Sequence, residues 1–235
     1  MKELALLWQN LKSRQWYHVG TLTFDNKYYR FEYTTKKERL GLSAAKKAGY
    51  HLHPGFPDED KIYEQERLFA SFSRRLPNMK RRDIIEKYQE FGLTFESNPM
   101  DLLQMSSGRL AADNYEFVRP IQKIGENQYS IEFYVRGMRY YNQGVQLEDL
   151  ELRPDKDNEY DENAISVFSS GKKIGYVPAF YAPQIREYLE AGHDLIVTKA
   201  FFDENEEFRH KLYLTVETNK IEFEKAVSEI VSFKE

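Results

Sequence analysis

The fold predicted for the second half of the chain rests on the stretch AISVFSSGKKIGYV, residues 164–177. Its two ends, 164–168 and 173–177, are short runs rich in β-branched and aromatic residues, which suit a pleated, half-buried surface. Gly171 between the two runs interrupts the regular pattern. The stretch therefore predicts two short β-strands.

The sequence on both sides of this stretch continues the succession of short strands and turns. Short strands around a single helix favour a small, partly closed barrel with one packed helix, placed at residues 128–218. Apolar residues on one helical face predict a separate C-terminal helix over 219–235. The remaining elements predicted for the barrel are strands at 131–135, 146–152, 194–201 and 209–216 and a helix at 182–190.

Residues 1–120 form the first predicted domain, which opens with a hairpin. The runs on either side of Asp25 and Asn26, from Trp16 to Thr34, are aromatic and β-branched, and these two residues tolerate the backbone of a tight turn. The charged stretch 36–47 is expected to be a loop.

Helical spacing of apolar residues follows the hairpin. It covers 62–76 and 84–91, with Gly92 as a stop signal after the second run. Asn98 followed by Pro99 is typical of the start of a third helix. The predicted fold class is thus α+β, with a hairpin-plus-helices unit before the barrel.

Composition limits the function classes. A chain of 235 residues holds one or two domains at about 150 residues each, and 41% hydrophobic residues suffice for a core. No run approaches the ~20 apolar residues of a membrane span, and the N-terminus lacks the features of a secretory signal. The absence of cysteine excludes disulfides and cysteine-bound zinc. A cytoplasmic protein is the simplest expectation.

The net charge of −4 is unevenly distributed. Residues 1–120 hold 20 basic and 16 acidic side chains, whereas 121–235 hold 14 basic and 22 acidic ones. Proteins that coat nucleic acid usually carry a broad basic surface. A nucleic-acid site in the second half must therefore be small.

Three blocks of the second half concentrate residues with binding chemistry. They are 136–144 with Arg139-Tyr140-Tyr141, 152–165 with Tyr160-Asp161, and 171–178 with the pattern glycine-x-x-isoleucine-glycine-tyrosine ending at Tyr176. In this order the blocks resemble the HIRAN domain of SWI/SNF-type DNA-repair translocases and stand-alone bacterial proteins, over 131–216. The resemblance implies an OB-like barrel that grips the 3′-hydroxyl end of single-stranded DNA.

The same resemblance implies the DNA-binding residues. They are Arg139, Tyr140, Tyr141, Tyr160, Asp161, Tyr176 and Phe208, the last on an aromatic position of the binding surface. Family members that bind nucleic acid have a phosphate-binding lysine where this chain has Ala179. Lys172, Lys173 and Arg186 are the candidates to replace that lysine.

The chemistry of these residue types agrees with such a role. Two tyrosines could sandwich a terminal base, and aromatic stacking contributes about 1–3 kcal/mol per base. The Asp161 carboxylate can accept a hydrogen bond from a 3′-hydroxyl and would repel a 3′-phosphate. The Arg139 guanidinium suits the next phosphate. The alternative is that the tyrosines form the barrel core and that Asp161 caps its own turn.

The first half is similar, more faintly, to the opening segment of HipA-type toxin kinases. The similarity lies in 18–22, 29–33, 56–58 and 68–76, and in those kinases such a segment helps to engage an antitoxin. Kinase activity is rejected because no glycine-rich phosphate loop with a following lysine and no His-Arg-Asp block occurs.

Other signals in the first half are weak. Arg74-Arg75 and Lys80-Arg81-Arg82 are interpreted as a solvated face, with a phosphate-tracking strip as the alternative. His51 and His53 lack further ligands at metal-binding spacing, so neither a metal nor a cofactor is expected.

These observations lead to one expectation with two alternatives. We expect a bacterial recognition module for single-stranded DNA 3′ ends, without catalysis of its own, that positions a helicase, nuclease or antitoxin. The first alternative is a protein-interaction scaffold of a toxin–antitoxin or DNA-repair system. The second is an enzyme with a site that the sequence does not reveal.

Overall fold

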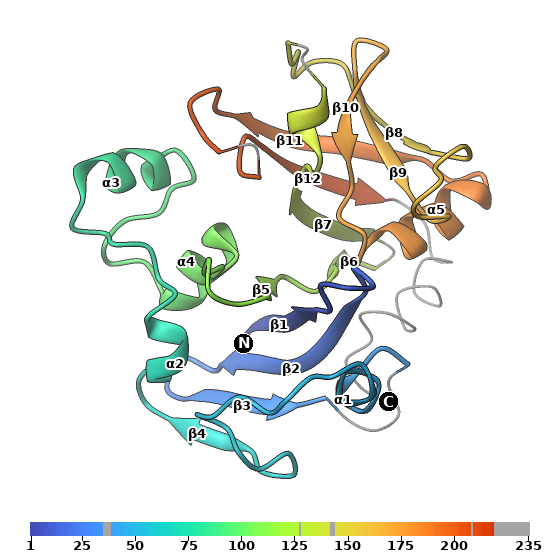
Figure 1. Cartoon of the computed structure of the whole chain (residues 1–235). Coiled ribbons are helices and arrows are strands. Elements are labelled where there is room, and N and C mark those ends of the chain that lie inside the picture. Colours follow the sequence, from blue (N-terminus) through green and yellow to red (C-terminus); the bar gives the residue numbers. More distant parts are fainter. Residues whose placement is uncertain (35–38, 127, 142–143, 208, 219–235) are drawn as a thin grey trace. The chain divides into compact units, whose positions relative to one another are not determined.

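Figure 1 shows the computed structural model of the chain, which describes all residues except 35–38, 127, 142–143, 208 and 219–235. The chain divides into two units, Met1–Pro120 and Ile121–Glu235. Both units are mostly β, with antiparallel sheets and a few short helices. Among the described residues, no helix has the length and apolar character of a membrane span.

Unit 1 is built on a five-stranded antiparallel sheet (Figure 1). The strand order is β4-β3-β2-β1-β5, so the first strand of the chain lies inside the sheet rather than at its edge. A hairpin-plus-helices unit was the expectation, and the larger sheet corrects it. The strands are β1 (Lys2–Gln9), β2 (Trp16–Phe24), β3 (Tyr29–Tyr33), β4 (Tyr63–Gln65) and β5 (Tyr115–Val118).

The hairpin predicted between Trp16 and Thr34 is confirmed as β2 and β3. Asn26 has the left-handed backbone expected of the turn, with φ of 78°. The Asp25 carboxylate accepts hydrogen bonds from the backbone N–H groups of Tyr28 (2.8 Å) and Lys27 (3.0 Å). These bonds, together with the Arg30 guanidinium, lower the pKa of Asp25 to about 2. The turn is therefore closed by local groups.

The sequence pattern predicts no element at β1, which pairs with both β2 and β5. Its residues Leu4, Ala5, Leu6 and Leu7 are all buried. A strand buried on both faces has a continuous apolar run instead of an alternating pattern. For that reason residues 4–7 show no alternation of apolar and polar side chains from which a strand could be predicted.

Two further predictions for unit 1 were wrong. The helix over 62–76 is absent, and that stretch contains β4 and the four-residue helix α2 (Ala70–Ser73). The expected loop 36–47 contains the helix α1 (Leu42–Lys47). Both differences follow from tertiary packing, which overrides local pattern.

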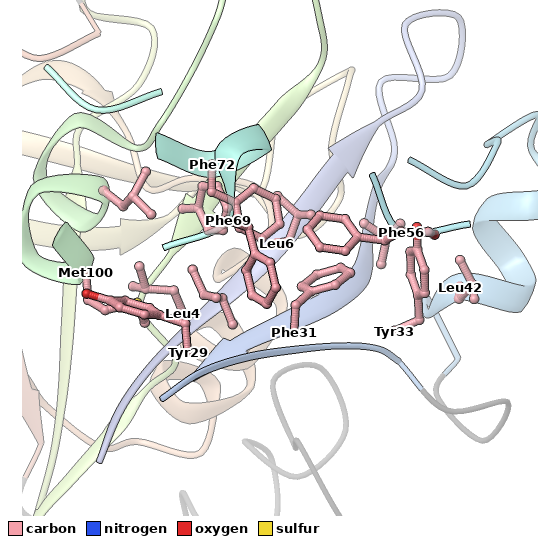
Figure 2. Close-up of a cluster of buried hydrophobic side chains, with 14 of the residues drawn as sticks. Leu4, Leu6, Tyr29, Phe31, Tyr33, Leu42, Phe56, Phe69, Phe72 and Met100 are labelled. Atoms are coloured by element: carbon pink, nitrogen blue, oxygen red, sulfur yellow. The ribbon is translucent and has the colours of Figure 1, made fainter. Parts of the chain in front are cut away.

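Aromatic packing dominates the core of unit 1 (Figure 2). Phe31 on β3 is fully buried, and its ring centroid lies 4.4 Å from that of Phe56 and 5.3 Å from that of Phe72. Phe72 on α2 and Phe69, which directly precedes α2, belong to this core. Phe69 and Phe72 of the stretch 62–76 therefore pack in this compact aromatic core rather than on the face of a long helix.

The two later helices of unit 1 agree with the sequence. α3 (Arg82–Gln89) covers most of the predicted 84–91 segment, and Gly92 follows it with φ of 72°. α4 (Pro99–Ser106) begins after Asn98, whose side chain accepts the Met100 N–H at 2.8 Å. A proline in the first turn loses no helical hydrogen bond.

Unit 2 contains two antiparallel sheets, with strand orders β10-β9-β8 and β11-β12-β7-β6. The helix α5 (Ala182–Glu190) has the predicted bounds, and a 3-10 turn, η1 (Met138–Tyr140), follows β7. The strands are β6 (Gln122–Gly125), β7 (Gln128–Tyr134), β8 (Leu150–Pro154), β9 (Ile165–Ser169), β10 (Lys172–Tyr176), β11 (Leu195–Phe202) and β12 (Leu212–Thr218).

The strand predicted at 146–152 begins later than expected, at Leu150, which is the first residue of β8. The Gln146 N–H donates to Ser169 Oγ at 2.8 Å, and the same hydroxyl donates to the Gln146 carbonyl at 3.1 Å. A side chain thus satisfies backbone groups that a strand would pair in a ladder.

A backbone bridge joins the two sheets of unit 2. Arg136, beyond the end of β7, exchanges two hydrogen bonds of 2.8 Å with Tyr176 on β10. A Cβ atom at Gly175 would lie 2.6 Å from the Arg136 carbonyl oxygen, so this close approach requires glycine.

The sheets do not form a closed barrel in the described residues. β8 and β11 lie in contact, but no ladder of hydrogen bonds joins them there. The OB-like barrel therefore stays a prediction. The predicted helix 219–235 and the predicted site residue Phe208 lie outside the described residues.

Candidate nucleic-acid interface

The centre of the site is a tyrosine–lysine cluster formed by Tyr141, Tyr176 and Lys173. Tyr141 follows η1, and its hydroxyl donates to that of Tyr176 on β10 at 3.0 Å. The Lys173 ammonium lies 4.2 Å from the Tyr176 ring centroid and 5.8 Å from that of Tyr141. Burial, together with the hydrogen bond to Tyr176, raises the pKa of Tyr141. The Tyr141 phenol therefore remains a neutral donor at physiological pH.

The position of Tyr141 depends on the turn that precedes it. Gly137 has φ of 75°, and a Cβ atom there would lie 3.2 Å from the Tyr176 ring. Glycine at 137 thus lets the chain reverse directly against Tyr176.

Lys173 also forms an ion pair with Asp155, just beyond β8, at 2.6 Å. Burial by itself would lower the pKa of Lys173, but the interactions with Asp155 and Tyr176 outweigh it and raise the pKa. The hydrogen bond from Lys173 in turn lowers the pKa of Asp155. Both groups are therefore charged at neutral pH.

Asp155 opens a loop, residues 155–163, whose shape is set by side chains. The Asn158 amide donates to Asp155 Oδ2 at 3.2 Å. Asn158 Oδ1 accepts the backbone N–H groups of Tyr160 and Asp161, each at 3.0 Å. Asp161 Oδ1 accepts the N–H of Asn163 at 2.9 Å. This succession of Asx turns fixes the backbone that presents Tyr160 and Asp161.

Two tyrosines of unit 2 project into solvent. The Tyr160 residue is 96% exposed and Tyr140 is 69% exposed. The Arg139 guanidinium lies 4.7 Å from the Tyr140 ring centroid and donates to its hydroxyl. The Tyr160 ring has no hydrogen bond or ring contact among the described residues. The alternative in which these rings form the core therefore does not hold for Tyr140 and Tyr160.

The alternative for Asp161 holds for one of its oxygens. Asp161 Oδ1 caps the turn through Asn163, as a turn residue does. For Oδ2, no hydrogen bond or ion pair is found in the described part of the chain. The carboxylate thus keeps one acceptor oxygen available for a ligand.

The cations predicted to contact phosphate are in different environments. Lys173 is paired with Asp155, and Arg186 on α5 is paired with Glu190 at 2.8 Å and donates to the Glu162 carbonyl. Lys172 is exposed and has no ion pair within the described ranges. Ala179 is exposed.

The structure thus joins predicted residues that are far apart in sequence. Tyr141, Tyr176 and Lys173 meet directly, and Asp155 and Asn158 connect them to the loop that carries Tyr160. Sequence reasoning missed Asp155 and the role of Asn158 in this connection. Their signal was the turn-forming composition of the block, which indicates a turn but not its partner.

Three of the five basic residues at 74–75 and 80–82 are paired with carboxylates. Arg75 is buried and paired with Asp113, while Arg81 pairs with Asp83 at 2.6 Å and Arg82 with Glu86 at 2.8 Å. The pairing of exposed Arg81 and Arg82 favours the solvated-face interpretation over a phosphate-tracking strip, whereas buried Arg75 fits neither interpretation. No three His, Cys, Asp or Glu side chains gather as a metal site would require in the described residues.

Comparison with known proteins finds similarity to one family over the part of the chain that carries the site. The family model of the HIRAN domain matches residues 128–219. The match supports a nucleic-acid-binding role for this part of the chain. Unit 1 lies outside the match, and the comparisons do not support its similarity to HipA-type kinases.

Two solved structures are similar to the chain. The HIRAN domain of human HLTF is 29% identical, with a TM-score of 0.35, over 45% of this chain and 90% of that one. A protein from Lactobacillus plantarum is 24% identical, with a TM-score of 0.30, over 39% and 96%. No curated protein matches the chain.

Proposed function

We propose that residues 128–219 bind the 3′-hydroxyl end of single-stranded DNA and have no catalytic activity of their own. The observation that carries the proposal is the almost fully exposed Tyr160 ring, held beside Asp161 on a loop within the HIRAN match. A folded chain gains no packing energy from a ring in this position. A ligand that stacks on the ring would gain this packing energy.

Stacking would give affinity without sequence preference. Tyr160 and Tyr140 are the exposed rings, and every base has a π-face on which such rings stack. Arg139, which lies over Tyr140, supplies a planar cation that can pair with the phosphate next to the stacked base.

Asp161 would supply the preference for the end. Its Oδ2 can accept a hydrogen bond from a 3′-hydroxyl, whereas a terminal phosphate would meet a like charge. A hydrogen bond to a charged group contributes about 1.5–3 kcal/mol, so the hydroxyl end should bind at least about tenfold more tightly.

Of the four cations predicted to contact DNA, two are available, which predicts weak salt dependence. Arg139 and Lys172 are exposed, while Lys173 and Arg186 are engaged within the protein. Each phosphate contact to a single strand contributes about −0.7 to the slope of log K against log salt, so we expect a slope of roughly −1 to −2.

The test is fluorescence anisotropy with oligonucleotides labelled at the 5′ end. Matched strands end in a 3′-hydroxyl or a 3′-phosphate, and a circular strand offers no end. We expect the strand that ends in a 3′-hydroxyl to bind at least about tenfold more tightly than the other two ligands. Equal affinity for all three ligands, or no binding, would overturn the proposal.

Two variants make the test specific for the carboxylate. Asp161→Asn keeps an oxygen to accept the Asn163 N–H but removes the charge, so the preference for the hydroxyl end should fall. Glu162→Gln removes a neighbouring exposed charge and should leave the preference unchanged. Incubation of labelled DNA with divalent metals should produce no cleavage, in line with a binding module.

The acidic excess of residues 121–235 favours a second candidate, a protein-interaction scaffold. The exposed Ala179, in place of a phosphate-binding lysine, points the same way. A helicase, nuclease or antitoxin is the class of partner proposed. If capture of such a partner by the whole chain survives nuclease treatment while the anisotropy test fails, the scaffold replaces the DNA-end proposal.

A further inference from the structure

The surroundings of Lys173 point to a role other than phosphate contact. Its ammonium group has three N–H donors, and it is surrounded by the Asp155 carboxylate and the rings of Tyr176 and Tyr141. Only about a quarter of its side chain is exposed. A phosphate at this ammonium would have to compete with the carboxylate that already neutralises its charge.

The contacts of Asp155 extend this arrangement to the loop 155–163. Its Oδ2 atom accepts both the Lys173 ammonium at 2.6 Å and the Asn158 amide at 3.2 Å. Because the Asn158 amide donates in this direction, its oxygen faces the N–H groups of Tyr160 and Asp161. One unbroken set of hydrogen bonds therefore runs from the ammonium to the backbone of the two recognition residues.

We infer that Lys173 is a positioning residue, which holds the loop 155–163 through Asp155 and Asn158 so that Tyr160 and Asp161 keep one orientation relative to the Tyr141–Tyr176 pair. The consequence for DNA binding rests on the function proposed above. The effect of Lys173 on the loop 155–163 is independent of that function, because it concerns the free protein.

The neighbouring Lys172 offers a matched control. Successive residues of a strand point to opposite faces, and Lys172 on β10 is exposed without an ion pair in the described residues. Lys172→Met and Lys173→Met change the formal charge and the side-chain length equally. Only the second variant removes the partner of Asp155.

The first measurement is amide hydrogen exchange of Tyr160 and Asp161, followed by NMR in the free protein. Without its cation, the Asp155 carboxylate turns to solvent and releases the Asn158 amide. We expect both amides to exchange roughly three- to tenfold faster in Lys173→Met, as befits a weakened hydrogen bond. Lys172→Met and Lys173→Arg should resemble the wild type, since arginine retains the ion pair.

The second measurement is the anisotropy assay with the two kinds of end. Lys173→Met should reduce the preference for the 3′-hydroxyl several-fold and leave the salt slope unchanged. A phosphate contact would instead lower the slope by about 0.7 and weaken both ends equally. That pattern for Lys173→Met would overturn the inference.

The two measurements separate failure of the inference from failure of the proposed function. If the wild type does not distinguish the ends, the proposed function fails, and the exchange rates still decide the role of Lys173. Unchanged exchange at Tyr160 and Asp161 in Lys173→Met overturns the inference whatever the DNA result. If Lys173→Met does not fold, Asp155→Asn replaces it, with faster exchange expected at the same two amides.

Discussion

The two units use aromatic side chains in opposite ways. In unit 1, Phe31, Phe56 and Phe72 are fully buried and contact each other, with ring centroids 4.4–5.3 Å apart. In unit 2, Tyr140 at the end of η1 and Tyr160 on the loop 155–163 are exposed, and the Tyr141–Tyr176 pair lies between these extremes. The same kind of ring thus stabilises the fold where it is buried and remains available for recognition where it is exposed.

The largest effect expected from this comparison is on the stability of unit 1. Phe56→Ala removes a buried ring that packs on Phe31 and Phe72, and such changes cost about 3–5 kcal/mol. Urea denaturation followed by intrinsic fluorescence measures the loss. A cost below about 1 kcal/mol would mean that the aromatic core is not the main support of unit 1.

The reverse pattern is expected for the exposed ring of unit 2. Tyr160→Ala should cost about 1–3 kcal/mol in binding to single-stranded DNA, because a stacking surface is lost. Its free energy of unfolding should change by less than about 0.5 kcal/mol. Anisotropy and denaturation on the same sample compare the two. Unchanged binding would contradict the stacking role.

The half-buried pair should give an intermediate result. Tyr176→Phe keeps the ring under Lys173 but removes the hydroxyl that accepts from Tyr141, which should cost about 0.5–1.5 kcal/mol of stability. Tyr160→Phe is the control, because its hydroxyl has no partner in the described residues. If both variants lose the same stability, the distinction between the pair and the exposed ring disappears.

The smallest effect is a pH dependence of the loop 155–163. The folded state lowers the pKa of Asp155 from its ordinary value of 3.8, so the pairing with Lys173 stabilises the fold fully above that value. The contribution is lost as the pH falls from there through the lowered pKa. NMR titration should show the Asp155 pKa moving up toward 3.8 in Lys173→Met but not in Lys172→Met. The opposite movement would exclude the ion pair as its cause.

Local signals accounted for the elements that the sequence predicted well. The Asp25–Asn26 turn and the Asn98 cap depend on hydrogen bonds to groups two or three residues away. The helix predicted over 62–76 is absent because Phe69 and Phe72 pack in a core shared with Phe31 and Phe56, which lie outside that stretch. The strand β1 was missed because burial on both faces removes the alternation by which a strand is recognised.

In the candidate site, too, local turns could be predicted from the sequence and tertiary contacts could not. The residues around Asp161 were predictable as a turn, since Asx residues specify turns through contacts with their own neighbours. The engagement of Lys173 by Asp155, 18 residues away, and its position over Tyr141 and Tyr176 are visible only in the folded structure. The partner of a charged side chain depends on which strands and loops come together, and that is settled by the burial of the whole domain rather than by any local stretch.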